Sequence, residues 1–351
     1  MTIADLLRFC RAEGCSDLHL SQGLPMRMRK NGVLVPVPGT ETLSPAETAE
    51  LICSLLDEGR RARLEAGEDL DFACETGPRE RCRVNVYRQR LGLAAAVRIL
   101  RDEIPSLEAL GLPPVLRELC SHQNGLVLIT GPTGSGKSTT LAAMIDHISR
   151  QRSTHILTVE DPIEYVFEQH LSLVHQREVG AGVGSFAGAL RSALREDPDV
   201  LLVGEMRDYE TISTAVTAAE TGHLVLSTLH TTGAAQTIDR IVDSCPPEAQ
   251  KQMRSQLSMI LRGVVTQQLL PLSSGGGRVA ATEVLIGTDA VANMIRENRC
   301  FQLPSIMQAG LAGGMHTMNA DLARLVREGK IAARLALERS NDRGDFKQYM
   351  E

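Results

Sequence analysis

The sequence predicts an α/β protein in which a small α+β module precedes a larger domain built on a parallel sheet. The chain has 351 residues, which is long for one domain and favours two. From about residue 115 onward, short apolar runs alternate with helical segments, a pattern typical of parallel strands joined by crossover helices. One of these runs leads into the glycine-rich loop GPTGSGKST at 131–139, which a helical segment follows.

Residues 1–103 predict the α+β module. Ala4–Glu13 has a helical pattern, and the segment 16–38 alternates like strands interrupted by turns. Ser44-Pro-Ala-Glu predicts the start of a second helix, because Ser is a good N-cap, Pro suits the first helical position and Glu suits the first turn. Residues 83–98 predict a strand, a glycine-containing turn and another strand.

The segment IPSLEALGLPP at 104–114 holds three prolines and a glycine, and it predicts the linker to the second domain. That domain is expected to span residues 115–351. Its strands are predicted at 125–130, 155–159, 199–203 and 223–228, with helices at 137–149 and 186–195. The part after about residue 240 is expected to be mostly helical.

Composition argues against several classes of protein. The net charge of −6 gives no overall attraction to a polyanion. The chain has no Trp, four Tyr and six Phe, which is a poor basis for an aromatic platform that stacks single-stranded nucleic acid. No apolar run approaches the roughly 20 residues of a membrane-spanning helix. The N-terminal residues lack the pattern of a secretory signal, so a cytoplasmic protein is expected.

The eight cysteines are scattered along the chain, and no two form a C-x-x-C pair. This pattern favours reduced structural thiols over disulfides or a tetracysteine metal site. The sequence therefore predicts that the protein binds no zinc.

The loop GPTGSGKST fits the P-loop pattern in the context that the pattern requires, between a strand and a helix. Its glycines let backbone N–H groups surround phosphate oxygens, and the helix N-terminus adds a positive dipole. Lys137 supplies a point charge, and Ser138 offers a hydroxyl ligand to Mg²⁺. The expected binding residues for ATP with Mg²⁺ are Gly131, Pro132, Thr133, Gly134, Ser135, Gly136, Lys137, Ser138 and Thr139. A glycine-rich turn without a ligand is the alternative.

An apolar run ends in a carboxylate at DVLLVGE, residues 199–205. In a P-loop fold the neighbouring strand brings a carboxylate close to the magnesium ion and the attacking water. Glu205 is therefore the leading candidate to orient that water, and to meet Mg²⁺ through a water molecule. The alternative is a buried strand that happens to end in Glu.

Two more polar groups lie at the ends of predicted strands. TVEDPIE at 158–164 places Glu160 and Asp161 at the edge of the sheet where ligands bind. These residues fit an Asp-Pro turn with solvated acids equally well. His223 and His230 flank a third strand. A single His is more often structural than catalytic, but two His at one strand favour phosphate sensing.

Together these motifs resemble those of the secretion-type hexameric ATPases, and within them the type IV pilus retraction ATPases, the PilT group. SDLHLSQGLPMRMRKNG at 16–32 is similar to the family's N-terminal signature, and GPTGSGKST to its Walker A motif. TVEDPIEY at 158–165 resembles its aspartate box, DPDVLLVGEMRD at 197–208 its Walker B motif and TGHLVLSTLHTTGA at 221–234 its histidine box. The resemblance covers essentially the whole chain.

This resemblance implies a PAS-like N-terminal domain and a RecA-like P-loop ATPase domain, assembled as a homohexamer. It also implies catalytic roles for Lys137, Glu160, Glu205, His223 and His230, and it assigns Asp161 to the aspartate box together with Glu160. Arg83 and Arg98 match N-domain arginines that reach towards the nucleotide phosphates in relatives, although each alone is typical of a solvated strand arginine. Whether Glu205 or Glu160 is the general base stays open.

The implied function is retraction of type IV pili driven by ATP hydrolysis. The implied partner is a pilus platform protein of the inner membrane, so the motor would be peripheral at the cytoplasmic face. A second retraction ATPase is a further implied partner, and nucleic acid is not. A pilus-assembly or type II secretion ATPase is the nearer alternative, although such relatives usually carry a tetracysteine zinc insertion and a longer N-terminal region. A nucleic-acid translocase is the more distant alternative.

The direction of work depends on AVANMIRE at 290–297, which resembles the motif AIRNLIRE of retraction ATPases, with Ala292 in place of its first Arg. Spacing alone predicts an ordinary amphipathic helix. Its apolar stripe would contain Val291, Met294 and Ile295, and its exposed residues would be Asn293, Arg296 and Glu297. The segment GLAGGMHTMNADL at 310–322 also resembles the same group and favours retraction.

Overall fold

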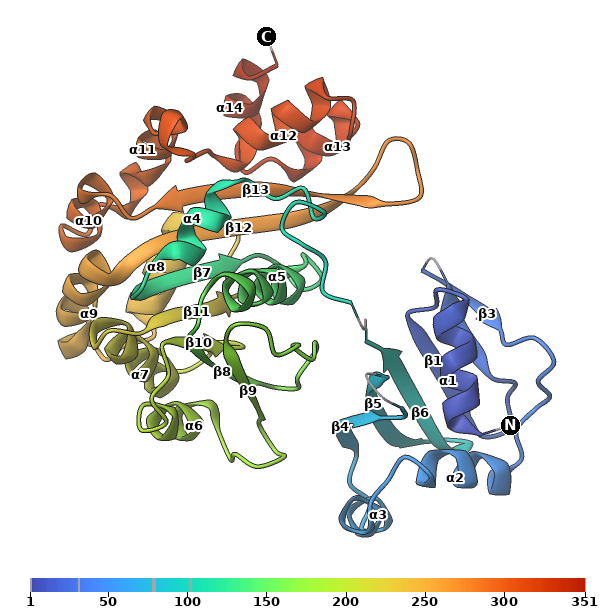
Figure 1. Cartoon of the computed structure of the whole chain (residues 1–351). Coiled ribbons are helices and arrows are strands. Elements are labelled where there is room, and N and C mark those ends of the chain that lie inside the picture. Colours follow the sequence, from blue (N-terminus) through green and yellow to red (C-terminus); the bar gives the residue numbers. More distant parts are fainter. Residues whose placement is uncertain (1, 31, 78–79, 101–102, 351) are drawn as a thin grey trace. The chain divides into compact units, whose positions relative to one another are not determined.

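The computed structural model describes residues 2–30, 32–77, 80–100 and 103–350, which form two compact units (Figure 1). The first unit comprises residues 1–103 and 162–166, and the second comprises 104–161 and 167–351. The segment expected to be the linker, 104–114, belongs to the second unit, where Leu107 and Leu112 are buried. Residues 162–166, which include the second half of the aspartate box, group with the first unit, a placement that the sequence did not predict.

In its described residues, the first unit is an antiparallel sheet with three helices. Its elements are α1 (Ile3–Ala12), β1 (Asp17–Ser21), β2 (Arg27–Lys30), β3 (Val33–Pro36), α2 (Pro45–Cys53), α3 (Glu58–Glu65), β4 (Leu70–Glu75), β5 (Arg81–Gln89) and β6 (Gly92–Ile99). Among the described residues, the strands follow the order β3-β2-β1-β6-β5-β4. Leu6, Ile52 and Val97 belong to one core, so α1 and α2 pack on the same sheet.

Local sequence explains where α2 begins. The Ser44 hydroxyl accepts a hydrogen bond from the Glu47 N–H, and the Glu47 carboxylate accepts one from the Ser44 N–H. This capping box satisfies two backbone donors that the helix itself cannot satisfy. Pro45 occupies the first helical position, where its missing N–H costs no hydrogen bond. The predicted start of this helix is therefore confirmed.

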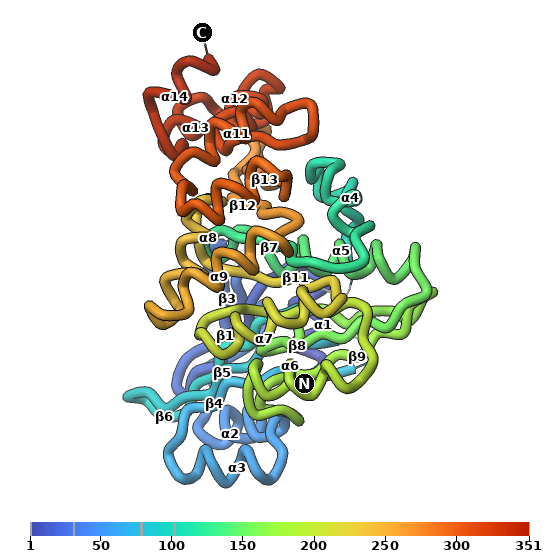
Figure 2. Tube along the Cα trace, turned by 90° about the vertical axis from the view of Figure 1, so that its left-hand side faces the viewer, coloured from blue at the N-terminus to red at the C-terminus, as the bar shows by residue number. Residues whose placement is uncertain are grey.

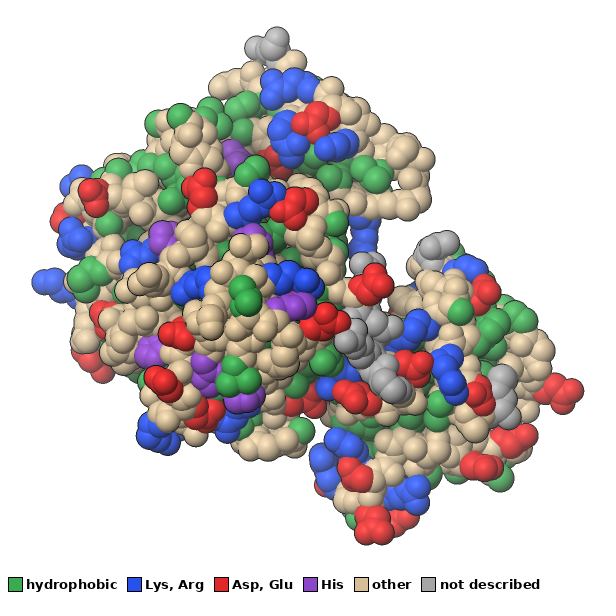
Figure 3. All heavy atoms as spheres, viewed as in Figure 1, with side chains coloured by type: hydrophobic (Ala, Val, Ile, Leu, Met, Phe, Trp, Pro, Cys, Tyr) green, Lys and Arg blue, Asp and Glu red, His purple; other side chains and the backbone are tan. Residues whose placement is uncertain are grey.

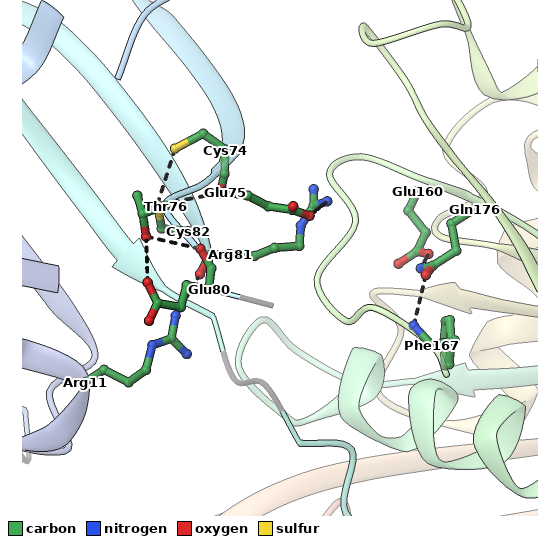
Figure 4. A network of polar contacts seen from close by, with 10 residues as sticks. All are labelled: Arg11, Cys74, Glu75, Thr76, Glu80, Arg81, Cys82, Glu160, Phe167 and Gln176. Atoms are coloured by element: carbon green, nitrogen blue, oxygen red, sulfur yellow. Dashed lines mark hydrogen bonds and ion pairs between the residues drawn. The ribbon is translucent and has the colours of Figure 1, made fainter. Parts of the chain in front are cut away.

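The cysteines of the chain are free thiols, and most of them are buried. Burial raises the pKa of Cys10 and of Cys300 to about 11 in each case, so these thiols stay protonated near neutral pH. Cys74 and Cys82 face each other across β4 and β5, with 3.4 Å between their sulfur atoms (Figure 4). At this distance one free thiol can donate a weak hydrogen bond to the other, and the pair joins the two strands.

The second unit is built on a mostly parallel sheet. Its elements up to the end of the sheet are α4 (Val115–Ser121), β7 (Gly125–Thr130), α5 (Lys137–Gln151), β8 (His155–Glu160), β9 (Leu173–Glu178), α6 (Phe186–Ala193), β10 (Val200–Val203), α7 (Tyr209–Glu220), β11 (Leu224–Leu229), α8 (Ala234–Asp243), α9 (Pro247–Ile260), β12 (Leu261–Pro271) and β13 (Arg278–Ile286). In the part of the chain that is described, the strand order is β13-β12-β7-β11-β10-β8-β9. Only β13 runs antiparallel to its neighbour within this sheet of described residues.

Helices cover both faces of this sheet. Helices α6–α9 share one core with alternate residues of the strands, including Leu126, Leu157 and Val225. Helices α4 and α5 pack on the opposite face (Figure 1). Every residue of β7, β10 and β11 is buried, as expected for strands covered on both sides. The predicted α/β class, with an α+β domain followed by a RecA-like domain, is confirmed.

The expectation of a mostly helical region after residue 240 was wrong in part. Strands β12 and β13 form a long hairpin there, and strand β9 was also not predicted. The apolar run of β12 lies between β7 and β13 in the sheet, so it shows none of the alternation that marks a half-exposed strand. Periodicity alone cannot separate such a run from a buried helix.

The remaining elements follow β13 and cover the hairpin. They are α10 (Asp289–Arg296), the short 3₁₀ helices η1 (Cys300–Gln302) and η2 (Leu311–Gly313), α11 (Leu303–Ala309), α12 (Met318–Arg327), α13 (Ala333–Arg339) and α14 (Arg343–Gln348). Leu270 and Ala281 of the hairpin share a core with Leu322 and Phe346. Figures 1 and 2 show α12–α14 gathered beside β13. In α10, Val291 and Ile295 are buried and the predicted amphipathic helix is present.

Candidate nucleotide-binding site

The predicted P-loop connects the end of β7 to the start of α5. Gly131, Gly134 and Gly136 all have positive φ angles, which favour glycine, and Gly136 is the N-cap of α5. Lys137 is therefore the first residue of the helix, where the positive end of the helix dipole lies. Ser138 is half-buried in the first turn. This is the strand–loop–helix context that phosphate binding requires.

The structure connects three of the predicted residues through side-chain contacts. Lys137 is buried, and its Nζ donates to the carbonyl oxygens of Gly131 at 2.9 Å and Pro132 at 3.1 Å. The same Nζ lies 3.5 Å from Nδ1 of His230. On its other side, Nε2 of His230 lies 3.4 Å from Oε1 of Glu205. The P-loop, the histidine box and the Walker B strand thus meet at one point.

Glu205 is held by its neighbours. Its second carboxylate oxygen forms an ion pair with Arg207 at 2.8 Å. The chain just after β10 is held to the neighbouring strand β11, because the Thr228 hydroxyl donates a hydrogen bond to the Gly204 carbonyl oxygen at 2.6 Å. A carboxylate at this edge, beside a P-loop lysine, can accept a hydrogen bond from a water molecule and so orient it.

Glu160 ends β8, the strand next to β10. Its Oε1 accepts hydrogen bonds from the Thr158 hydroxyl at 2.7 Å and from the Gln176 amide at 3.3 Å. Gln176 also accepts a bond from the Phe167 N–H at 2.9 Å, as Figure 4 shows. The parallel strands β8 and β10 end at the same sheet edge, so Glu160 and Glu205 lie on the same edge as the P-loop. Asp161 follows β8 and is exposed.

Not every predicted residue joins this cluster within one chain. His223 lies before β11 and His230 after it, so His223 is at the opposite edge of the sheet, roughly 20 Å away by strand geometry. Its Nδ1 lies 2.9 Å from the Ala218 carbonyl oxygen, a contact that closes the end of α7. The expectation that both histidines sense phosphate is therefore not supported for His223 within a single chain.

Arg83 and Arg98 lie in the first unit, on β5 and β6. Arg83 makes a two-pronged ion pair with Asp71, at 3.0 and 2.6 Å. Nε of Arg98 lies 3.2 Å from a carboxylate oxygen of Asp17. Both guanidinium groups thus have carboxylate partners, and a role at a phosphate requires an exchange of partner.

Sequence reasoning missed two polar residues of β12, one that contacts strand β7 and one that contacts the P-loop. The Thr266 hydroxyl lies 2.8 Å from the hydroxyl of Thr130, the last residue of β7. Gln267, which is 1% exposed, contacts both the loop and α5. The sequence does contain an indication of this role. Two consecutive glutamines within an apolar run are unusual in a core, and buried amides require hydrogen-bond partners.

The surface adds little that points to another ligand. On the face that Figure 3 shows, Lys and Arg side chains alternate with Asp and Glu side chains. In the described ranges, no three His, Cys, Asp or Glu side chains gather closely enough to hold a metal ion. The absence of bound zinc stays a prediction. No described helix has the length and apolar character needed to cross a membrane.

This sheet, with its P-loop, its strand-end carboxylate and its central lysine, defines a P-loop ATPase. The chain matches the family described as Type II/IV secretion system protein over residues 7–343 and belongs to that family.

Two curated relatives and one solved structure are similar over most of their length. The Type IV pilus retractation ATPase PilT of Pseudomonas aeruginosa is 47% identical over 340 residues, which cover 97% of this chain and 98% of the relative. A protein of Neisseria gonorrhoeae named Twitching motility protein is 49% identical over 86% of this chain and 80% of its own length. The crystal structure of the pilus retraction motor PilT with bound ADP matches with a TM-score of 0.93 and 48% identity, covering 99% of both chains.

Proposed function

We propose that this chain is a motor that hydrolyses ATP to retract type IV pili. The observation that carries the proposal is the combination of a complete P-loop site with similarity to PilT over nearly the whole chain. The similarity includes α10, the helix that resembles the retraction motif. Retraction by such a motor underlies twitching motility.

ATP is proposed to bind at the P-loop together with Mg²⁺, which would neutralise phosphate charge when bound. Lys137 then exchanges the carbonyl groups of Gly131 and Pro132 for phosphate oxygens. Ser138 would offer its hydroxyl to the ion. Glu205 would orient the attacking water and meet the ion through a water molecule. His230 lies between Lys137 and Glu205 and contacts both. When phosphate draws the lysine away, His230 loses its contact with Lys137, and this change is transmitted to the Glu205 carboxylate.

We further propose that the motor works as a homohexamer. Arg83 and Arg98 belong to the N-terminal unit and pair with carboxylates in the single chain, so they can act on a phosphate only if they exchange these partners. In a ring, nucleotide can draw these arginines from their carboxylates, as cationic side chains do in other P-loop enzymes. Two domain arrangements that nucleotide favours differently would convert hydrolysis into work. We infer a peripheral position at the cytoplasmic face of the inner membrane, where the pilus platform protein is the partner and a second retraction ATPase can assist.

Assembly is expected to be required for full activity. With a non-hydrolysable ATP analogue, sedimentation should give the mass of six subunits, and the rate per subunit should rise with protein concentration. Arg83→Ala should lower turnover at least about 10-fold, since it removes a phosphate-directed charge. Arg63→Ala, at an exposed arginine of the same unit that also pairs with a carboxylate, serves as the control. Full-rate hydrolysis by a strict monomer would contradict the arrangement.

The direction of work is expected to depend on α10. Arg296, the last residue of this helix, and Glu297, its C-cap, are exposed, while Val291 and Ile295 anchor the helix to the core. Replacing both charged residues by alanine should therefore leave folding and ATP hydrolysis nearly unchanged, because surface substitutions cost only about 0.5 kcal/mol. Cells with this double variant should nevertheless carry extended pili that fail to retract, as microscopy of surface pili would show.

The matched control for α10 is Arg334→Ala with Glu338→Ala, an exposed pair four residues apart on α13 with 3.2 Å between charged atoms. It removes the same two charges elsewhere and should leave retraction intact. Loss of all pili in the α10 variant would instead favour the alternative of a pilus-assembly or type II secretion ATPase. Stimulation of hydrolysis by DNA would favour a nucleic-acid translocase.

A further inference from the structure

Gln267 lies where the P-loop leaves the sheet. Strand β12 runs parallel to β7, and Thr266 pairs with Thr130, the last residue before the loop. Gln267 comes next along β12 and is 1% exposed. A buried amide must find hydrogen-bond partners, and those partners show what the residue supports.

Both ends of the Gln267 amide are used on the nucleotide-binding elements. Its Nε2 donates to the Ser135 carbonyl oxygen at 2.6 Å, and its Oε1 accepts from the Thr140 hydroxyl at 2.9 Å. Ser135 belongs to the P-loop, and Thr140 lies one turn into α5. The side chain thus joins the loop to the helix that follows it.

The backbone of β12 also lies against the loop. A Cβ atom on Gly131 would be 2.2 Å from the Gln267 carbonyl oxygen, and one on Gly136 would be 3.0 Å from Gln267 Nε2. Both glycines have positive φ angles as well. Glycine is therefore needed at both positions for two reasons. Strand β12 leaves no room for a side chain, and the positive φ angles favour glycine.

The bond to Ser135 has a consequence for phosphate binding. The peptide between Ser135 and Gly136 is planar, and in a trans peptide the C=O and N–H groups point in opposite directions. Because Gln267 holds the Ser135 carbonyl towards β12, the Gly136 N–H faces away from β12. Backbone N–H groups of this loop are the donors that bind phosphate in P-loop proteins.

We propose that Gln267 is a positioning residue for nucleotide binding: it fixes the Ser135–Gly136 peptide so that the Gly136 N–H faces the bound phosphate. The proposal rests on the proposed binding of ATP at the P-loop and extends it to a residue outside the sequence motifs. Gln267 does not touch the nucleotide; it acts through the loop.

The test compares Gln267→Met with wild type and with Thr266→Val. Methionine has a similar length but neither hydrogen bond, so the dissociation constant for MgADP and the KM for ATP should rise about 10- to 100-fold, with a smaller change in kcat. Thr266→Val removes an equally buried hydrogen bond of the same strand, at 2.8 Å from Thr130, without touching Ser135 or α5. It should lower Tm and leave MgADP affinity unchanged.

Equal MgADP affinity in Gln267→Met and wild type would overturn the proposal, as would an equal loss in Thr266→Val. Wild-type protein that does not bind MgADP would overturn the nucleotide site itself. If Gln267→Met does not fold, Thr140→Val removes one anchor of the amide and should weaken MgADP binding, and Thr140→Ser should restore it. Unchanged affinity in folded Thr140→Val would then contradict the proposal.

A pH profile provides a readout that a purely structural role would not change. In Gln267→Glu, a protonated carboxyl can donate to the Ser135 carbonyl, and an ionised one can only accept. The ratio of its MgADP dissociation constant to that of wild type should therefore rise between about pH 6 and about pH 8, where a buried glutamate ionises. A ratio that stays constant across this range would contradict the proposal.

Discussion

Replacing Lys137 by alanine is expected to reduce ATP hydrolysis to below about 1% of the wild-type rate, because loss of one preorganised charge at a reacting phosphate costs 10²- to 10³-fold. No other lysine stands between positions 30 and 251, so no neighbouring ammonium group in the sequence can replace it. Release of inorganic phosphate by purified protein measures the effect.

The matched control is Lys251→Ala, the same substitution at an exposed position of α9. It should leave the rate unchanged. Lys137→Ala should also keep its fold, since the hydrogen bonds of the lysine to the carbonyl oxygens of Gly131 and Pro132 lie within the P-loop and not between the strands of the sheet. Circular dichroism checks this point. Hydrolysis by Lys137→Ala at more than about a tenth of the wild-type rate would show that the P-loop is not the catalytic phosphate site.

Glu205→Gln is expected to bind ATP with nearly wild-type affinity and to lose about 10²- to 10⁴-fold in kcat, the range for removal of a group that handles the proton of the attacking water. Glutamine keeps the shape of the side chain, and its single oxygen can still accept a hydrogen bond from either His230 or Arg207, which contact different oxygens of Glu205. The comparison of nucleotide titrations with single-turnover hydrolysis separates binding from chemistry.

Glu160→Gln, measured in the same way, assigns the role of general base. The carboxylate of Glu160 already accepts bonds from Thr158 and Gln176, whereas Glu205 faces Lys137 through His230. A smaller loss is therefore expected in Glu160→Gln than in Glu205→Gln. Near-normal turnover of Glu205→Gln, together with loss of turnover in Glu160→Gln, would assign the role of general base to Glu160.

Local chemistry explains why part of this fold and site could be predicted from sequence. The capping box at Ser44 and the glycines of the P-loop act over a few residues, so their patterns are readable. The strands ending at Glu160 and Glu205 are buried runs followed by acids, and parallel strands bring their ends to one edge. The site of Lys137, Glu205 and Glu160 follows from these facts.

The remaining features depend on which segments meet in space. Gln267 supports a loop that is more than a hundred residues away in sequence, and its strand lacks the alternation that marks a half-exposed strand. The two histidines of the histidine box look equivalent in sequence, yet the strand between them places them at opposite edges of the sheet. The contact of His230 with both Lys137 and Glu205 also depends on three-dimensional packing.

The proposed motor function is tested most directly by imaging single labelled pili in the source organism after deletion of this chain. The deletion strain is supplied with the wild-type chain or with Glu205→Gln. We expect cells without the chain, and cells with Glu205→Gln, to extend pili that stay extended, and we expect the wild-type chain to restore retraction. Deletion cells that lose their pili, or that retract them at the normal rate, would contradict the account.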